Sequence, residues 1–221
     1  MQTLADELMQ VGTWLPCAKN ERRWVGAPLR VHRRCDEPMF GVINRVVYDN
    51  LMVFGTPPRD EPIFQETARP LPATKWLDVP SRHSDGYWVP AEGERLAEAL
   101  EYLHNHGHDM TTVMVLAPFR DVARGVDLIC RRYPGVRGGT VHTAQGKEAD
   151  VVFLVLGSDP QRPGAPNLLN VAVSHAKRRL YVIGDRHAWR GLRPYFSELA
   201  DALPVRTDET ARTEDCKGTE Q

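Results

Sequence analysis

The sequence lacks the marks of a secreted, membrane-spanning or strongly basic protein. Its four cysteines form no C-x-x-C pair and no signal peptide opens the chain, which predicts a reducing, cytoplasmic location. No apolar run approaches the roughly 20 residues that span a bilayer, so no membrane partner is expected. The net charge of -1 gives no overall basic field, so a nucleic-acid site must be local or shared with another domain.

The sequence also lacks the phosphate-binding loop G-x-x-x-x-G-K-[ST]. The nearest segment, residues 139–148, has its glycines too far apart and carries Glu148 where a hydroxyl would bind magnesium. No strand ends in paired acids, and the histidines at 104, 106 and 108 have no fixed acid or cysteine partner, so no metal site is predicted. A chain that handles ATP without these parts must form one half of a composite site. No G-x-G-x-x-G follows a first strand, which argues against an independent dinucleotide enzyme.

Length and composition fit one soluble domain with extensions. The 221 residues are 42% hydrophobic and 26% charged, which are ordinary values for a globular protein. Buried strands alternate with amphipathic helices, which predicts an α/β fold with a mainly parallel sheet covered by helices on both faces. We expect this domain over residues 1–204, with a proline-rich excursion at 55–90, and a disordered tail over 205–221.

Hydrophobic periodicity and helix breakers place the individual elements. Helices are predicted at 37–50, 92–106, 121–133 and 194–202, and a short helix at 170–177. Strands are predicted at 74–79, 111–117, 151–157 and 178–185, and a strand or turn at 12–16. The aromatic residues Trp76, Tyr87 and Trp88 lie in the excursion, where packing onto the sheet is favoured over stacking on nucleic-acid bases.

Four sequence blocks stand out in order along the chain. They are residues 28–33, 116–120, 140–150 and 170–177. The third and fourth blocks resemble motifs V and VI of superfamily 1 helicases of the 5′-to-3′ branch. The first resembles the family's Gln-Tyr-Arg-Met-His-Pro block, and the second resembles motif IV. The resemblance covers roughly residues 25–190 and implies the second, C-terminal RecA-like domain, a three-layer fold of the P-loop NTPase superfamily.

The resemblance implies a nucleotide-binding role for four residues. Arg30 corresponds to an arginine that contacts the γ-phosphate of ATP. Gly146, Lys147 and Glu148 lie where motif V approaches the phosphates and ribose. Without the resemblance, Arg30 would be interpreted as a solvated surface charge and Gly146 as part of an ordinary turn.

The resemblance places nucleic-acid contacts in two other stretches. Thr143 and Gln145 correspond to motif V positions that couple the nucleotide to the nucleic acid. Pro118 and Phe119 lie near the face expected to bind a single strand.

His175 departs from the family pattern, because motif VI has an arginine finger at this position. An imidazole is shorter, is mostly neutral at pH 7 and cannot form a bidentate contact with phosphate. Losing such a finger costs on the order of 10³-fold or more in hydrolysis. His175 is therefore either a weakened catalytic residue or a histidine on a helix surface. Lys177, Arg178 or Arg179 could substitute, although each is displaced along the chain.

The function implied by the resemblance is the C-terminal motor half of an ATP-dependent helicase that moves along single-stranded DNA or RNA. ATP and Mg²⁺ would be its cofactors. The Walker A and B motifs and the Mg²⁺ ligands would belong to a first RecA-like domain, upstream or on a separate chain. We therefore expect this chain to be a fragment or split gene product that is inactive alone. The alternative is a non-catalytic nucleic-acid-binding or regulatory module that keeps the fold.

Overall fold

The computed structural model describes residues 12–16, 22–26, 31–56, 71–80, 83–144, 146–158, 172–191 and 194–206. The chain divides into two compact units, Met1–Val31 and His32–Gln221. In the first unit, strands β1 (Gly12–Pro16) and β2 (Arg22–Gly26) pair antiparallel, so a strand and not a turn forms at 12–16. The domain limits of 1–204 stay a prediction.

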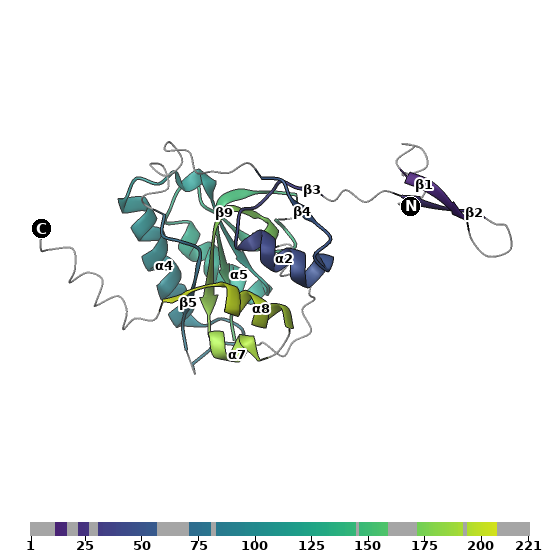
Figure 1. Ribbon diagram of the computed structural model, residues 1–221. Helices are drawn as coiled ribbons and strands as arrows, with labels where there is room; N and C mark the ends of the chain where they lie inside the picture. Colours follow the sequence, from purple (N-terminus) through teal and green to yellow (C-terminus); the bar gives the residue numbers. More distant parts are fainter. Residues whose placement is uncertain are drawn as a thin grey trace, which may run out of the picture. The chain divides into compact units, whose positions relative to one another are not determined.

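A six-stranded sheet organises the second unit (Figure 1). Its strand order is β10–β5–β9–β8–β6–β7, and every neighbouring pair is parallel. The strands are β5 (Lys75–Asp78), β6 (Val113–Ala117), β7 (Arg137–Thr140), β8 (Ala149–Val155), β9 (Ala176–Gly184) and β10 (Val205–Arg206). We call the edge where β8 and β9 begin the amino edge, and the edge where β6 and β7 end the carboxyl edge.

Helices cover both faces of this sheet. On one face lie α4 (Pro90–Asn105) and α5 (Arg120–Cys130); on the other lie α2 (Met39–Tyr48), α7 (Arg186–Arg190) and α8 (Pro194–Ala202) (Figure 1). Successive strand residues point to opposite faces, so Val113 and Val115 pack with α4 and α5, whereas Met114 and Leu116 pack with α2 and α8. This three-layer arrangement confirms the predicted fold class.

The remaining elements are short. Strands β3 (Val31–His32) and β4 (Val53–Phe54) form a two-stranded sheet beside α2, and the 3₁₀ turn η2 (Met110–Thr112) leads into β6. The four longer predicted helices all form, and α8 has the predicted limits. Within the described ranges, no helix combines the length and the apolar character needed to cross a membrane.

Strand β5 differs from the surface excursion expected at 55–90. It pairs with β9 on one side and β10 on the other, inside the main sheet. The reason is Trp76, which is fully buried and donates its indole N–H to the carbonyl of Gly184 at 2.8 Å. Packing, not base stacking, therefore accounts for this tryptophan.

Residues 205 and 206, which the sequence assigned to a disordered tail, belong to the sheet instead. Val205 and Arg206 form β10 and lie opposite Trp76 and Leu77 of β5. The backbone N–H of Trp76 also donates to the carbonyl of Pro204 at 2.8 Å. The polar composition of this segment gave no sign of a strand, because two residues in the outermost strand of a sheet need little apolar character. Residues 207–221 lie outside the described residues.

Candidate functional site at two edges of the sheet

The segment resembling motif V, residues 140–150, connects the two edges of the sheet. It leaves β7 at Thr140, which is in register with Ala117 at the end of β6. It enters β8 at Ala149, in register with Ala176 at the start of β9. Because β8 is seven residues long, the two edges lie roughly 20 Å apart. Val141 and Ala144 are buried on the α2 side and hold the segment against that face.

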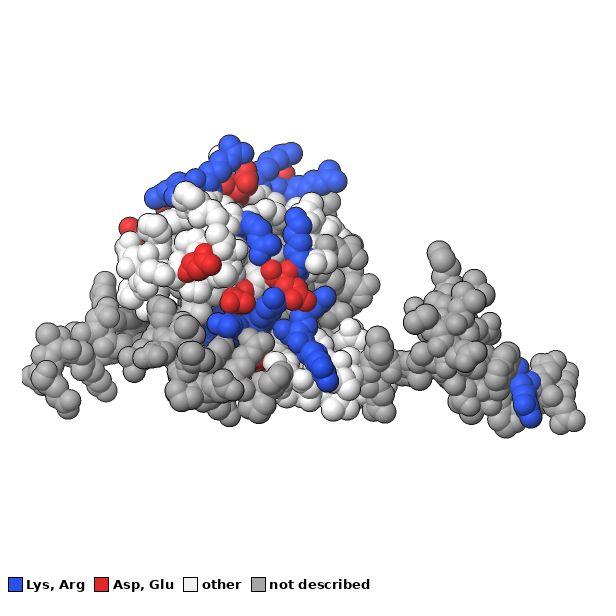
Figure 2. Space-filling view, turned by 90° about the horizontal axis from the view of Figure 1, so that it is seen from above, with Lys and Arg blue, Asp and Glu red and all other residues white. Residues whose placement is uncertain are grey.

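Charged side chains meet around Glu148 at the amino edge. Arg34 Nε lies 2.7 Å from Glu148 Oε1, and Lys177 Nζ lies 3.3 Å from Glu148 Oε2. Arg137 donates to the backbone carbonyl of Glu148 at 3.0 Å. Seen from above, this edge shows Lys and Arg side chains gathered around acidic ones (Figure 2). Sequence motifs pointed to Glu148 but not to Arg34, whose only signal in the sequence is the basic run in which it lies.

Backbone hydrogen bonds fix the segments that carry these charges. The N–H of Ala149 donates to the carbonyl of His175 at 3.1 Å, and the N–H of Asp36 donates to the carbonyl of Lys177 at 3.0 Å. Next to Arg34, Cys35 is fully buried, with its Sγ 3.1 Å from His32 Nε2. Three chain segments thus meet with little backbone freedom.

His175 is buried, in contrast to the helix-surface position considered from the sequence. Within the described part of the predicted helix at 170–177, residues 172–174 are helical and β9 already begins at Ala176, so the helix ends earlier than expected. The side chain is 1% exposed, and its Nδ1 donates to the carbonyl of Lys147, while Nε2 is buried without a partner in the described structure. Burial lowers the pKa of His175, and nearby Arg34 lowers it further. The imidazole is therefore neutral at pH 7 and directed inward.

Gly146 and Lys147 form the exposed turn before Glu148. Gly146 has φ = +82°, and apart from its chain neighbours no atom of the described residues lies within 4 Å of the position that a Cβ would occupy. The N–H of Lys147 donates to the carbonyl of Ala144 at 2.9 Å, which closes the turn. A positive φ favours glycine, and the open space leaves room for a ligand to approach the backbone.

Aromatic rings occupy the carboxyl edge. Phe119 follows Pro118 directly after β6, and its ring centroid lies 5.1 Å from that of Tyr87. Phe119 packs against the buried hydrophobic residues on both faces of the sheet and remains partly exposed. Thr143 is exposed at the same edge, where its hydroxyl donates to the carbonyl of Thr140 at 2.9 Å.

Trp88 holds the segment before α4 in place. Its ring lies against the backbone of two glycines, Gly93 of α4 and Gly125 of α5. A Cβ on Gly125 would lie 2.6 Å from Trp88 Cε3. The ring therefore occupies space that is open only because residue 125 has no side chain. The N–H of Ser158 donates to the carbonyl of Tyr87 at 3.1 Å. These contacts position Tyr87 beside Phe119, and they confirm packing as the role of Trp88.

Glu92 is a buried carboxylic acid beneath the carboxyl edge that sequence reasoning missed. It is 1% exposed, and its Oε2 accepts from the N–H of Gly157 at 2.8 Å. The pKa of Glu92 is raised to about 8, chiefly by burial and to a smaller extent by nearby Asp185, against the hydrogen bonds from the backbone. Its place within an amphipathic helix sequence gave no sign of this burial.

Two of the residues implicated by the resemblance, Arg30 and Gln145, lie outside the described residues. The other seven separate by role. Gly146, Lys147, Glu148 and His175 lie at the amino edge, and Pro118, Phe119 and Thr143 lie at the carboxyl edge.

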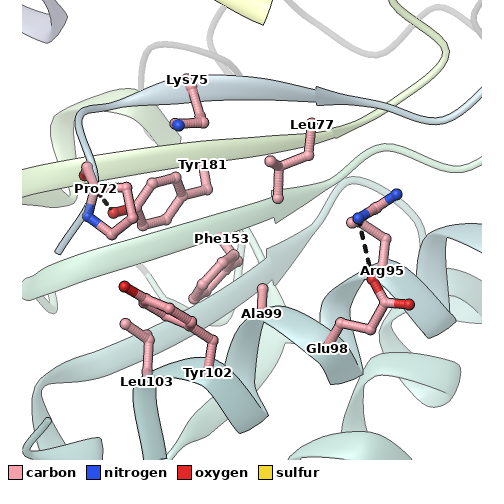
Figure 3. Close-up of a pocket in the computed structure, with 10 residues that line it drawn as sticks. All are labelled: Pro72, Lys75, Leu77, Arg95, Glu98, Ala99, Tyr102, Leu103, Phe153 and Tyr181. Atoms are coloured by element: carbon pink, nitrogen blue, oxygen red, sulfur yellow. Dashed lines mark hydrogen bonds and ion pairs between the residues drawn. The ribbon is translucent and has the colours of Figure 1, made fainter. Parts of the chain in front are cut away.

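A cavity of about 480 Å³ lies between α4 and strands β5, β8 and β9, away from these residues (Figure 3). Tyr102, Phe153 and Tyr181 point into it, with Lys75 at one side and the Arg95–Glu98 ion pair at the other. None of the described residues implicated by the resemblance lines it. Among the described residues, no three His, Cys, Asp or Glu side chains group in a way that could hold a metal ion.

Comparison with known protein families shows which family the chain belongs to. A family described as "AAA domain" matches residues 17–187, more than three quarters of the chain and all four sequence blocks. The chain belongs to this AAA domain family. The match confirms the resemblance to the second domain of superfamily 1 helicases. A search of curated proteins gave no match.

Solved structures with a similar fold include helicases. The C-terminal domain of a possible DNA helicase from Lactobacillus plantarum WCFS1 is 13% identical, with a TM-score of 0.48, over 79% of this chain and 99% of that one. The arterivirus nonstructural protein 10 helicase is 19% identical, with a TM-score of 0.35, over 72% and 26%. The structure of an arterivirus nonstructural protein 10 helicase in complex with DNA is 18% identical, with a TM-score of 0.39, over 76% of this chain and 28% of that one. The AAA domain chain thus spans about a quarter of the arterivirus helicases.

Proposed function

We propose that this AAA domain is the C-terminal motor half of an ATP-dependent superfamily 1 helicase. Its amino edge would complete an ATP site whose phosphate loop and Mg²⁺ ligands belong to a first RecA-like domain. Its carboxyl edge would form part of a track for single-stranded DNA or RNA. In a motor of this kind, hydrolysis opens and closes the cleft between the two domains and moves the pair along the strand.

The observation that carries this proposal is the course of residues 140–150. Residues with implied nucleotide contacts, Gly146 and Glu148, lie at one end of this segment, and Thr143, with an implied nucleic-acid contact, lies near the other. A change at the bound nucleotide can therefore reach the bound single-stranded nucleic acid through one short, well-packed segment of the chain. Coupling needs an element that both ligands bias, and this segment touches both edges.

The burial of His175 favours a second candidate, a nucleic-acid-binding module that hydrolyses no ATP. The imidazole is directed inward at the position of the family's arginine finger. On that reading the carboxyl edge still binds a strand, while the amino edge is only structural.

Mixing this chain with a first RecA-like domain that carries the Walker motifs distinguishes the two candidates. Hydrolysis of ATP that is stimulated by a single-stranded oligonucleotide, and that is lost in Arg30→Ala, supports the motor. Oligonucleotide binding without any hydrolysis in the mixture supports the module.

A further inference from the structure

Two cations share one carboxylate at the amino edge in a way that leaves both accessible. The side chains of Arg34 and Lys177, which lie 2.7 and 3.3 Å from the Glu148 oxygens, are 42% and 40% exposed. Ion pairs with this exposure contribute little to stability. Either cation can therefore exchange Glu148 for a more highly charged anion at small cost.

The backbone holds these cations in a fixed relation. Because β9 begins at Ala176, Lys177 is the second residue of this strand and does not lie on a helix. The hydrogen bond from the Asp36 N–H to the Lys177 carbonyl ties the Arg34 segment to that strand. Cys35, fully buried beside Arg34, anchors the same segment. The two charges thus converge from distant parts of the sequence onto one exposed spot.

His175 cannot present a charge to a ligand at this spot. Its ring is buried, and its Nδ1 donates to the carbonyl of Lys147. That hydrogen bond instead joins the start of β9 to the turn directly before Glu148. A residue that fixes this carbonyl also fixes the direction in which the Glu148 side chain leaves the backbone.

We propose that Arg34 and Lys177 are the cations that the amino edge presents to the polyphosphate of ATP, with Glu148 holding both in place beforehand and His175 acting as a positioning residue for the Lys147–Glu148 turn. This inference rests on the proposed function and deepens it. The guanidinium of Arg34 supplies a planar fork for phosphate oxygens, and Lys177 supplies a compact charge beside it. Together they take over the task for which motif VI otherwise uses an arginine.

The test is isothermal titration calorimetry of the full chain with Mg·ATP and with inorganic tripolyphosphate at low salt, which measures the affinity for each ligand. Arg34→Ala and Lys177→Ala should each weaken binding about tenfold, since each removes a charge-assisted contact. The double variant should bind more weakly than either. His175→Ala should weaken binding only a few fold and lower the melting temperature, because the Lys147 carbonyl loses its donor. His175→Asn keeps an N–H near the same place and should recover part of both losses.

Arg45→Ala is the matched control. Arg45 pairs with Glu198 at 3.1 Å, with side-chain exposures of 47% and 48%, in a similar ion pair on α2 and α8. Its loss should leave polyphosphate affinity unchanged. If the wild-type chain binds but Arg34→Ala and Lys177→Ala bind equally well, the inference is overturned and the proposed function stands. If the wild-type chain binds neither ligand even at millimolar concentration, the inference is overturned, whereas the proposed function is decided by hydrolysis in the two-domain mixture.

Discussion

The two edges of the central sheet are built in opposite ways. At the amino edge, Arg34, Glu148 and Lys177 meet as exposed charges on a fixed backbone. At the carboxyl edge, Phe119 and Tyr87 are rings packed onto the core, above the buried acid Glu92. Exposed ion pairs can exchange partners at little cost, whereas packed rings keep their place.

This difference matches two parts of a nucleotide-driven motor. An edge of exchangeable charges suits the phosphates of ATP, which change during a reaction cycle. A fixed aromatic edge suits the bases of a single strand, which stack on any flat ring. Although the segment 140–150 joins the two edges, they lie roughly 20 Å apart, so the comparison predicts that variants at one edge spare ligand binding at the other.

The largest expected effect is on hydrolysis by the assembled motor. Arg30→Ala should lower ATP turnover by about 10³-fold, because the γ-phosphate loses a cation in the transition state. Oligonucleotide affinity should stay as in the wild type. Turnover measured by phosphate release in the two-domain mixture checks this, with Arg45→Ala as the control. Full activity in Arg30→Ala would remove the nucleotide role from this block.

The next effect is on binding of a single strand. Phe119→Ala should weaken oligonucleotide binding by roughly 1–3 kcal/mol, which is about tenfold or more, because one stacking surface is lost. Polyphosphate affinity should not change. Fluorescence anisotropy with a labelled oligonucleotide measures this. Tyr102→Ala, which removes a 41% exposed ring on α4, is the control; equal losses in both variants would contradict a specific track at the carboxyl edge.

The packing below that edge can be tested through Gly125. Gly125→Ala should destabilise the fold by about 1–3 kcal/mol, because the new methyl group meets the Trp88 ring. This exceeds the gain in helix propensity of roughly 1 kcal/mol. Thermal unfolding measures the change. Gly191→Ala is the control, since nothing lies within 4 Å of its Cβ position. An unchanged melting temperature in Gly125→Ala would mean that Trp88 is not seated between α4 and α5.

The smallest effect concerns pH. The pKa of Glu92, raised to about 8 by burial, means that the folded state holds a proton that the unfolded state releases near pH 4.5. Its contribution to stability is therefore complete below pH 4.5 and is lost as pH rises through 8. Glu92→Gln should flatten the fall in melting temperature between pH 4.5 and 8, where roughly 2–4 °C corresponds to each kcal/mol of stability. Parallel pH curves for the two proteins would refute this.

Much of the fold followed from the sequence because apolar periodicity is a local signal. The predicted strand 74–79 became β5, and the predicted helix 194–202 is α8. The place of β5 in the sheet depends on Trp76 and Gly184, which are far apart in the chain, so no local pattern could show it.

The site was predicted less completely for the same reason. Motif spacing pointed to Glu148 and Phe119, which the structure places at separate edges. The inward direction of His175 depends on the carbonyl of Lys147, and the partnership of Arg34 with Glu148 depends on β9 starting at Ala176. Such contacts arise only when distant segments meet.

The separation of the two edges is tested most directly by following backbone amide signals of the ¹⁵N-labelled full chain during two titrations. Mg·ATP should shift the signals of Glu148 and Lys177, and a short single-stranded oligonucleotide should shift those of Phe119 and Thr143. Signals within residues 141–147 should respond to both ligands. If both ligands shift the same edge and leave the other unchanged, the two-edge account is contradicted.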